Sequence, residues 1–209
     1  MLKLYNYHRS VYGRVVVLIV TEKGLDCEHE EINPFADDLS PEYFKLHPFK
    51  RVPVLQHDDL VLYETRAITE YLEDQFPDPP LSPADPIERA RMRQIVSLID
   101  NYGYRPLVWQ VYVESVEKAA SGETTNSDIL RQGLQNSARV LDAIERLANG
   151  GEYLVGDSYS LADAHLIPMI DAFTVAKEGR AILPEYPKLS RWWNGIKKRD
   201  SSVTSRPKF

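Results

Sequence analysis

The chain has 209 residues, of which 43% are hydrophobic, and 25 Lys and Arg face 31 Asp and Glu for a formal net charge of −6. This length predicts a globular chain with its own core, built as one large domain or two small ones. The single cysteine excludes an internal disulfide, a cysteine-rich metal site and a Cys-x-x-Cys redox pair, and it favours a reducing, cytoplasmic location.

Membrane insertion and nucleic-acid binding are not expected either. The longest apolar run, residues 15–20, is far shorter than the roughly 20 residues of a membrane span, and the N-terminus lacks a signal-peptide pattern. The acidic excess lies in residues 1–78, and the remainder is close to neutral. Neither part has the basic excess that binding to a phosphate backbone requires.

The first 76 residues alternate strand and helix patterns. In chain order they predict a strand over 2–7, a helix over 11–23, a strand over 26–32, a loop or short helix over 33–47, a hairpin of strands 52–56 and 60–63, and a helix over 64–76. The helix over 11–23 contains several valines, which also suit strands, but Gly24 stands where a helix C-cap belongs.

Five prolines between residues 77 and 86 mark a domain boundary, because proline continues neither a helix nor a sheet ladder. Beyond them the apolar spacing predicts helices over 87–118, 127–149, 161–177 and 187–198. Ser160 and Asp163 have the spacing of a capping box at a helix start. We therefore expect an α/β domain over 1–78, a proline-rich linker over 79–86 and an all-helical domain over 87–209.

Ser10 lies at the predicted turn from the first strand into the first helix. The free amides and the positive dipole end of such a helix favour a nearby anion. The hydroxyl could therefore donate to a phosphate, a carboxylate or a thiolate, whereas a helix-capping role explains the same residue.

Two further pairs stand at strand ends. Val52-Pro53 begins a predicted strand, and such an X-Pro step indicates either an ordinary trans proline or a cis bond that turns main chain outward to pair with an extended peptide. Glu64 and Thr65 stand where a strand ends and a helix begins. They could bind the ammonium and carboxylate groups of one ligand, or could simply cap the helix.

Together these segments resemble the glutathione transferase family. The resemblance rests on Ser10-x-Tyr-Gly-Arg14, on the stretch from Asn33-Pro to Pro48-Phe-Lys-Arg-Val-Pro-Val-Leu55, and on Leu62-Tyr-Glu-Thr-Arg-Ala-Ile-Thr-Glu-Tyr-Leu72, in that order and spacing. The likeness is to serine-type enzymes of the phi and related bacterial groups, and residues 156–163 look like the family's capping motif. It implies a thioredoxin-like N-terminal domain, an all-α C-terminal domain and a homodimer.

The resemblance also implies roles for individual residues. Ser10 matches the serine that hydrogen-bonds the sulfur of glutathione, and Val52 with a cis Pro53 matches the main chain that pairs with its cysteinyl part. Glu64 and Thr65 match the clamp on the γ-glutamyl group, with Thr in place of the usual Ser. Arg51 stands where phi-type enzymes commonly have Gln and is a further candidate for contact with the peptide.

One part of the expected glutathione site departs from the family. Asp38 and Leu39 occupy, in an ungapped match, the positions of a His-Lys pair that holds the glycyl carboxylate. An acidic residue there repels a carboxylate. Either Lys50, Arg51 or another base takes over this contact, or glutathione binds weakly.

Several other residues are weighed for the chemistry. Tyr12 is the rival of Ser10 as hydroxyl donor, and Cys27, in a predicted strand, is expected to be inert. The five histidines show no metal-ligand spacing, so we assign no metal. Tyr12, Tyr104, Val108 and Tyr112 are the candidates for an electrophile pocket, although aromatic residues at helical spacing also occur in cores and interfaces.

The sequence thus predicts a glutathione transferase that conjugates reduced glutathione to small hydrophobic electrophiles, a reaction of detoxification. Two alternatives remain. One is a non-catalytic binding or scaffold module of the same fold, as in the gamma subunit of a translation elongation factor. The other is glutathione-dependent isomerisation, dehalogenation or ether cleavage.

Overall fold

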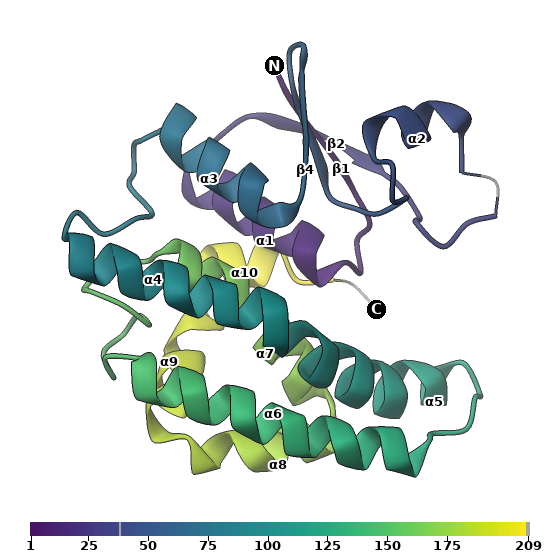
Figure 1. Ribbon diagram of the computed structural model, residues 1–209, viewed down its shortest axis with the longest axis vertical. Coiled ribbons are helices and arrows are strands. Elements are labelled where there is room, and N and C mark those ends of the chain that lie inside the picture. The colour runs from purple at the N-terminus through teal and green to yellow at the C-terminus, as the bar shows by residue number, and fades with distance from the viewer. Residues whose placement is uncertain (38, 208–209) are drawn as a thin grey trace. The chain divides into compact units, whose positions relative to one another are not determined.

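The computed structural model describes residues 1–37 and 39–207, which form two compact units (Figure 1). Unit 1 comprises the described part of Met1–Pro80 together with residues 200–207, and unit 2 comprises Leu81–Arg199. Residues 200–207 therefore pack with the first unit, although the sequence pattern had placed them in the helical domain. No helix in the described chain has the length and apolar content to cross a membrane.

The core of unit 1 is a four-stranded mixed sheet. Its strands are β1 (Leu2–Asn6), β2 (Cys27–Glu31), β3 (Val54–His57) and β4 (Leu60–Tyr63), in the order β2-β1-β3-β4. β1 runs parallel to β2 and antiparallel to β3, and β3 runs antiparallel to β4. This arrangement confirms the predicted thioredoxin-like fold.

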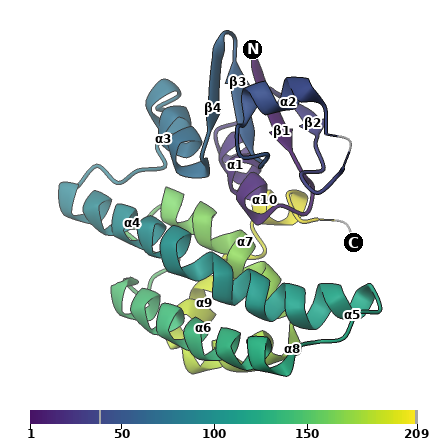
Figure 2. The same cartoon turned by 45° about the vertical axis from the view of Figure 1, so that its right-hand side comes forward.

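Four helices complete unit 1: α1 (Val11–Glu22), α2 (Pro41–Leu46), α3 (Thr65–Gln75) and α10 (Asp200–Thr204). α1 contacts both α3 and α10, whereas α2 lies on the other side of the sheet from α1 and α3 (Figure 2). The valines of α1 are helical because burial against the sheet overrides their weak helix propensity: Val15, Val16 and Val20 are all buried.

β3 begins two residues later than predicted. The sequence pattern placed the strand over 52–56, but the ladder starts at Val54 and ends at His57. Pro53 has no amide hydrogen and cannot donate to a ladder, so regular pairing begins only after it.

Unit 2 is helical throughout, as predicted. Its helices are α4 (Pro86–Leu98), η1 (Ile99–Gly103), η2 (Arg105–Glu117), α5 (Lys118–Ala120), α6 (Ser127–Leu147), α7 (Leu161–Val175), α8 (Lys177–Ile182), η3 (Leu183–Glu185) and α9 (Pro187–Ile196). η2 packs against both α6 and α7. α7 is mostly apolar, and its residues 161–170 are all buried, as expected for a central helix.

The helix predicted over 87–118 is regular only in its first part. From Ile99 to Glu117 its hydrogen bonds follow the wider π pattern; the Tyr104 amide, for instance, donates to the Ile99 carbonyl. Pro106 lies in this stretch and cannot make the ordinary bond to the residue four before it. The apolar spacing of the sequence did not distinguish the α-helical part of this segment from its π-helical part.

The predicted capping box is present at the start of α7. The fully buried carboxylate of Asp163 accepts from the Leu154 amide at 3.0 Å, from the Ser160 amide at 2.9 Å and from Trp192 Nε1 at 2.8 Å. Burial raises the pKa of Asp163, and these donors oppose that rise. One side chain thus joins the start of α7, the preceding loop and α9.

Candidate active site

Ser10 is the N-cap of α1. Its Oγ accepts a hydrogen bond from the Gly13 amide at 3.1 Å, so the capping role is real. This bond uses only a lone pair of the oxygen, and the hydroxyl proton can still be donated. The first turn of α1 contains no acidic side chain, so no carboxylate there offsets the positive end of the helix dipole.

Val52 and Pro53 lie immediately before β3, and the peptide bond between them is cis. Pro53 is buried, whereas Val52 is half-buried and Arg51 is exposed. The Arg51 carbonyl accepts a hydrogen bond of 2.6 Å from the hydroxyl of Tyr43, a buried residue of α2. Burial raises the pKa of Tyr43, so this hydroxyl keeps its proton and remains a donor.

Glu64 and Thr65 lie at the start of α3. Glu64 is the N-cap residue, but its side chain makes no capping hydrogen bond, so the carboxylate is not used to cap the start of the helix. Its backbone has φ 71° and ψ 111°, a strained conformation for a residue other than glycine. Such strain at an exposed acidic residue is typical of functional positions.

The strand register brings these three segments to one end of the sheet. Tyr5 of β1 pairs with Val54 of β3, and Val54 pairs with Tyr63 of β4. Ser10 follows β1, Val52 precedes β3 and Glu64 follows β4, so all three lie beyond this same row. An extended ligand lying across this end of the sheet could meet a hydroxyl, exposed main chain and a carboxylate in turn.

A buried histidine lies beside these segments. His47 follows α2, and its Nδ1 accepts a hydrogen bond from the Phe49 amide at 3.3 Å. Its ring lies 4.8 Å from that of Tyr63, the residue before Glu64. Burial is the main cause that lowers the pKa of His47; the charge of Arg51 adds to this effect and that of Glu64 opposes it. The imidazole is therefore neutral near pH 7.

The segment expected to hold a glycyl carboxylate is described in part. Asp38 lies outside the described residues, and Leu39 is half-buried just before α2. Of the basic candidates, the Lys50 ammonium lies 4.3 Å from the centre of the Phe44 ring, whereas Arg51 is exposed beside Val52.

The electrophile candidates fall in both units. Tyr12 is half-buried in the first turn of α1, in unit 1. In unit 2, Tyr104 precedes η2, and Val108 and Tyr112 lie on it. Val108 and Tyr112 are buried, whereas Tyr104 is half-buried and its ring lies 6.4 Å from that of Trp109.

Two contributors were missed by the sequence reasoning. Tyr43 was not singled out within the expected loop or short helix over 33–47, and His47 was considered only as a metal ligand. Their roles depend on contacts with Arg51, Phe49 and Tyr63 that no local pattern encodes.

The chain matches two family profiles, the glutathione S-transferase N-terminal domain over residues 4–80 and the glutathione S-transferase C-terminal domain over residues 104–200. It is 32% identical over 174 residues to Glutathione S-transferase 1 of Dianthus caryophyllus, covering 82% of this chain and 76% of that one. It is also 32% identical over 190 residues to the maleylacetoacetate isomerase of Mus musculus, covering 90% of this chain and 83% of that one.

Solved structures agree with these sequence matches. A crystal structure of an F-series glutathione transferase from Populus trichocarpa is similar with a TM-score of 0.86 and 27% identity, covering 98% of this chain and 97% of that one. A glutathione S-transferase structure bound with lactoylglutathione has a TM-score of 0.85 at 27% identity, covering the same shares of the two chains.

Proposed function

The chain belongs to the glutathione S-transferase family of enzymes, and we propose that it stabilises the thiolate of reduced glutathione through Ser10 and adds it to small hydrophobic electrophiles. The observation that carries this proposal is the hydrogen bonding of the Ser10 hydroxyl at the start of α1. Its oxygen caps α1 through a lone pair, and its proton can still be donated to a sulfur at the positive end of that helix.

The magnitude of the required effect is modest. A free thiol has a pKa of about 8.5 and is only a few per cent ionised at pH 7. A pKa lower by about two units makes it mostly thiolate and corresponds to roughly 2.7 kcal/mol of preferential binding of the anion. A hydrogen bond to a charged group contributes about 1.5–3 kcal/mol and the helix dipole up to about 2 kcal/mol.

The rest of the tripeptide lies across the same end of the sheet in this proposal. The Val52 main chain, next to the cis bond to Pro53, pairs with the cysteinyl part as an added strand would. Glu64 binds the γ-glutamyl ammonium, and Thr65 with the free amides of α3 binds its carboxylate. The lack of a capping bond from Glu64 supports this role, because the carboxylate remains available.

Arg51 takes the glycyl carboxylate in place of the absent His-Lys pair. Its guanidinium is exposed next to Val52, whereas the Lys50 ammonium lies over the Phe44 ring. Arginine also binds carboxylates with two parallel hydrogen bonds. Tyr12, half-buried in the first turn of α1, supplies aromatic surface for the electrophile.

A titration of bound glutathione tests the proposal. The ultraviolet absorbance of the thiolate is followed against pH for the native protein, Ser10→Ala and Tyr12→Phe. We expect a bound-thiol pKa well below 8.5 in the native protein and in Tyr12→Phe, and a return toward the free value in Ser10→Ala. Loss of the shift in Tyr12→Phe alone would assign the donor to Tyr12, and no binding at all would favour the non-catalytic module.

Isomerisation is a second candidate, because relatives described as maleylacetoacetate isomerase are 32% and 33% identical to this chain. In that reaction the thiolate adds to the substrate, a bond rotates, and the sulfur leaves again, so glutathione is regenerated. Product analysis separates the two candidates. A stable conjugate indicates transfer, and an unchanged concentration of free thiol with a converted substrate indicates isomerisation.

A further inference from the structure

The C-terminal helix α10 is held in unit 1 by polar contacts. Ser201 and Ser202 are buried, whereas Val203, its one aliphatic residue, is 54% exposed. A helix normally packs through an apolar face, whose burial supplies most of its stability. α10 has no such face, so its position depends on hydrogen bonds.

Arg14 of α1 makes the principal contacts to this segment. Its Nη2 donates to the Ser202 carbonyl at 3.0 Å, and its Nε donates to Ser205 Oγ at 3.2 Å. Arg14 is only 5% exposed although it is charged, and a buried guanidinium requires well-placed acceptors. The segment 200–205 supplies two of these acceptors, although it lies nearly two hundred residues from Arg14 in the sequence.

Arg14 lies one helical turn from Ser10. Its amide donates to the Ser10 carbonyl at 2.9 Å, and the Gly13 amide donates to Ser10 Oγ at 3.1 Å. The backbone of Arg14 is thus bonded to Ser10 and its side chain to the segment 200–205. A shift of the guanidinium would move the turn on which Ser10 sits.

We propose that Arg14, anchored by residues 200–205, is a positioning residue that holds the first turn of α1 so that Ser10 Oγ can activate the thiol. The inference rests on the proposed role of Ser10. The C-terminal segment then supports the chemistry of the N-terminal unit. Arginine is needed at position 14 of the Ser10-x-Tyr-Gly-Arg14 motif because its guanidinium donates to two acceptors at once.

The contacts of Arg14 are not needed to hold α1 on the sheet. Val15, Leu18 and Ile19 of α1 are fully buried, and this apolar burial fixes the helix as a whole. A second contact to α10 lies at the other end of α1, where Ser201 Oγ donates to Glu22. This far-end contact offers a control, because it joins the same two helices without touching the first turn.

Four proteins test the proposal: Arg14→Met, Arg14→Lys, a chain that ends at Arg199, and the control Ser201→Ala. The chain ending at Arg199 keeps the charge of Arg14 but removes its two acceptors in the segment 200–205. It therefore distinguishes the effect of anchoring Arg14 from the effect of its positive charge. Hydrogen exchange of the Gly13 amide reports the first turn without any ligand. The bound-thiol pKa, kcat and KM for glutathione report the chemistry.

We expect Arg14→Met and the shortened chain to exchange the Gly13 amide about tenfold faster than the native protein. Their bound-thiol pKa should rise by about one unit, which lowers the thiolate fraction and kcat at pH 7 about threefold, while KM changes less than twofold. Arg14→Lys, which retains the positive charge and a donor nitrogen but not the planar guanidinium, should fall between these variants and the native protein. Ser201→Ala should match the native protein in all four quantities.

Native exchange at Gly13 together with a native thiol pKa in the shortened chain and in Arg14→Lys would overturn the proposal. Equal effects of Ser201→Ala and Arg14→Met would overturn it too, since the contact would then only stabilise the fold. If the native protein does not lower the thiol pKa, the proposed function of Ser10 fails. The exchange rates would still decide whether Arg14 holds the first turn.

Discussion

At the scale of single residues, the hydroxyl of Tyr43 is a short link between α2 and the main chain next to Val52. It donates to the Arg51 carbonyl at 2.6 Å from a residue that is 3% exposed. Without this donor, the Arg51 carbonyl either loses the hydrogen bond or moves to find another partner. Either outcome would disturb the segment expected to pair with glutathione.

We therefore predict that Tyr43→Phe raises KM for glutathione several-fold and changes kcat little, because binding is affected more than thiol activation. Steady-state kinetics with glutathione as the varied substrate measure both constants. Tyr5→Phe is the matched control: the Tyr5 ring lies 6.2 Å from that of Tyr43, but its hydroxyl donates to Gln56 Oε1. A larger effect on kcat than on KM would contradict this role of Tyr43.

Gly13 marks the close approach of α1 to β1. A Cβ atom added there would lie 1.5 Å from the Asn6 side-chain oxygen, so Asn6 would have to move. At Gly195, on the exposed side of α9, an added Cβ would have no neighbour within 4 Å among the described residues. The close contact with Asn6 therefore requires glycine at position 13, whereas the described residues leave room for a larger side chain at position 195.

We predict that Gly13→Ala destabilises unit 1 by about 1–3 kcal/mol through overpacking. Gly195→Ala should stabilise unit 2 by up to about 1 kcal/mol, because alanine favours a helix interior. Urea unfolding curves of both variants measure the two changes. Equal shifts of the same sign would show that helix propensity, rather than the contact with Asn6, governs position 13.

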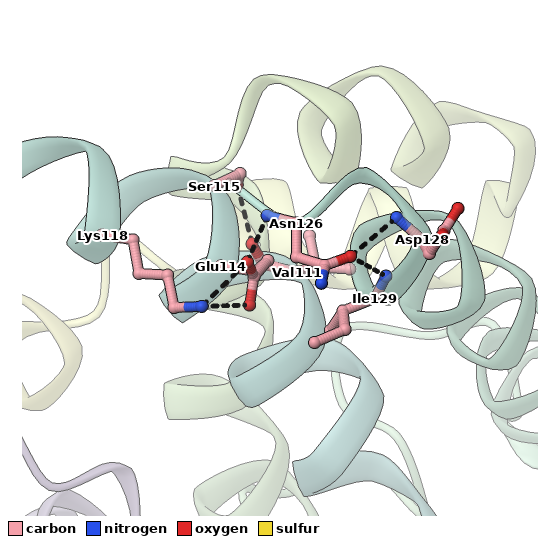
Figure 3. Close-up of polar contacts among 7 residues, drawn as sticks. All are labelled: Val111, Glu114, Ser115, Lys118, Asn126, Asp128 and Ile129. Atoms are coloured by element: carbon pink, nitrogen blue, oxygen red, sulfur yellow. Dashed lines mark hydrogen bonds and ion pairs between the residues drawn. The ribbon is translucent and has the colours of Figure 1, made fainter. Parts of the chain in front are cut away.

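At the scale of elements, the buried carboxylate of Glu114 ties the end of η2 to the start of α6 (Figure 3). It accepts from the Asn126 amide at 2.5 Å and from the Lys118 ammonium at 3.0 Å. Asn126 in turn caps α6 by accepting from the amides of Asp128 and Ile129. One carboxylate thus fixes the residue from which a helix of 21 residues begins.

The pKa of Glu114 is lowered because these bonds outweigh the effect of its burial. A lowered pKa in the folded state contributes stability that is present above the unfolded value and is lost as the pH falls through the folded value. We predict that Glu114→Gln costs about 1–3 kcal/mol at pH 7 and that this difference from the native protein shrinks below about pH 4.

Urea unfolding at both pH values measures this dependence. Asp128→Asn is the control, because Asp128 is exposed and its side chain pairs only with Arg131 among the contacts described. A cost of Glu114→Gln that stays constant with pH would show that shape, rather than charge, fixes this junction.

At the scale of the whole molecule, the chain leaves unit 2 after α9 and returns to unit 1 as α10. The family resemblance predicts that two such chains form a homodimer. Sedimentation at micromolar concentration should then give a particle of about twice the 24.0 kDa chain mass. A particle with the mass of one chain would contradict this prediction.

The sequence determined most of the local elements of this protein and indicated the segments of the candidate site. The order of the strands, the helical second unit and the capping box at Ser160 were predicted correctly because hydrophobic period and capping chemistry act over a few residues, whereas the short helices α8 and α10 were not predicted. The proline cluster after residue 76 and the serine at the first strand-to-helix turn were readable for the same reason.

Only the tertiary structure decided how distant segments meet. The pairing of Tyr5, Val54 and Tyr63 in one row, the bond from Tyr43 to Arg51 and the anchoring of Arg14 by residues 200–205 join positions far apart in the chain. The strained backbone of Glu64 and the π-helical turns after α4 also depend on their surroundings. Such features follow from the packing of the whole chain, which outweighs local preference where the two conflict.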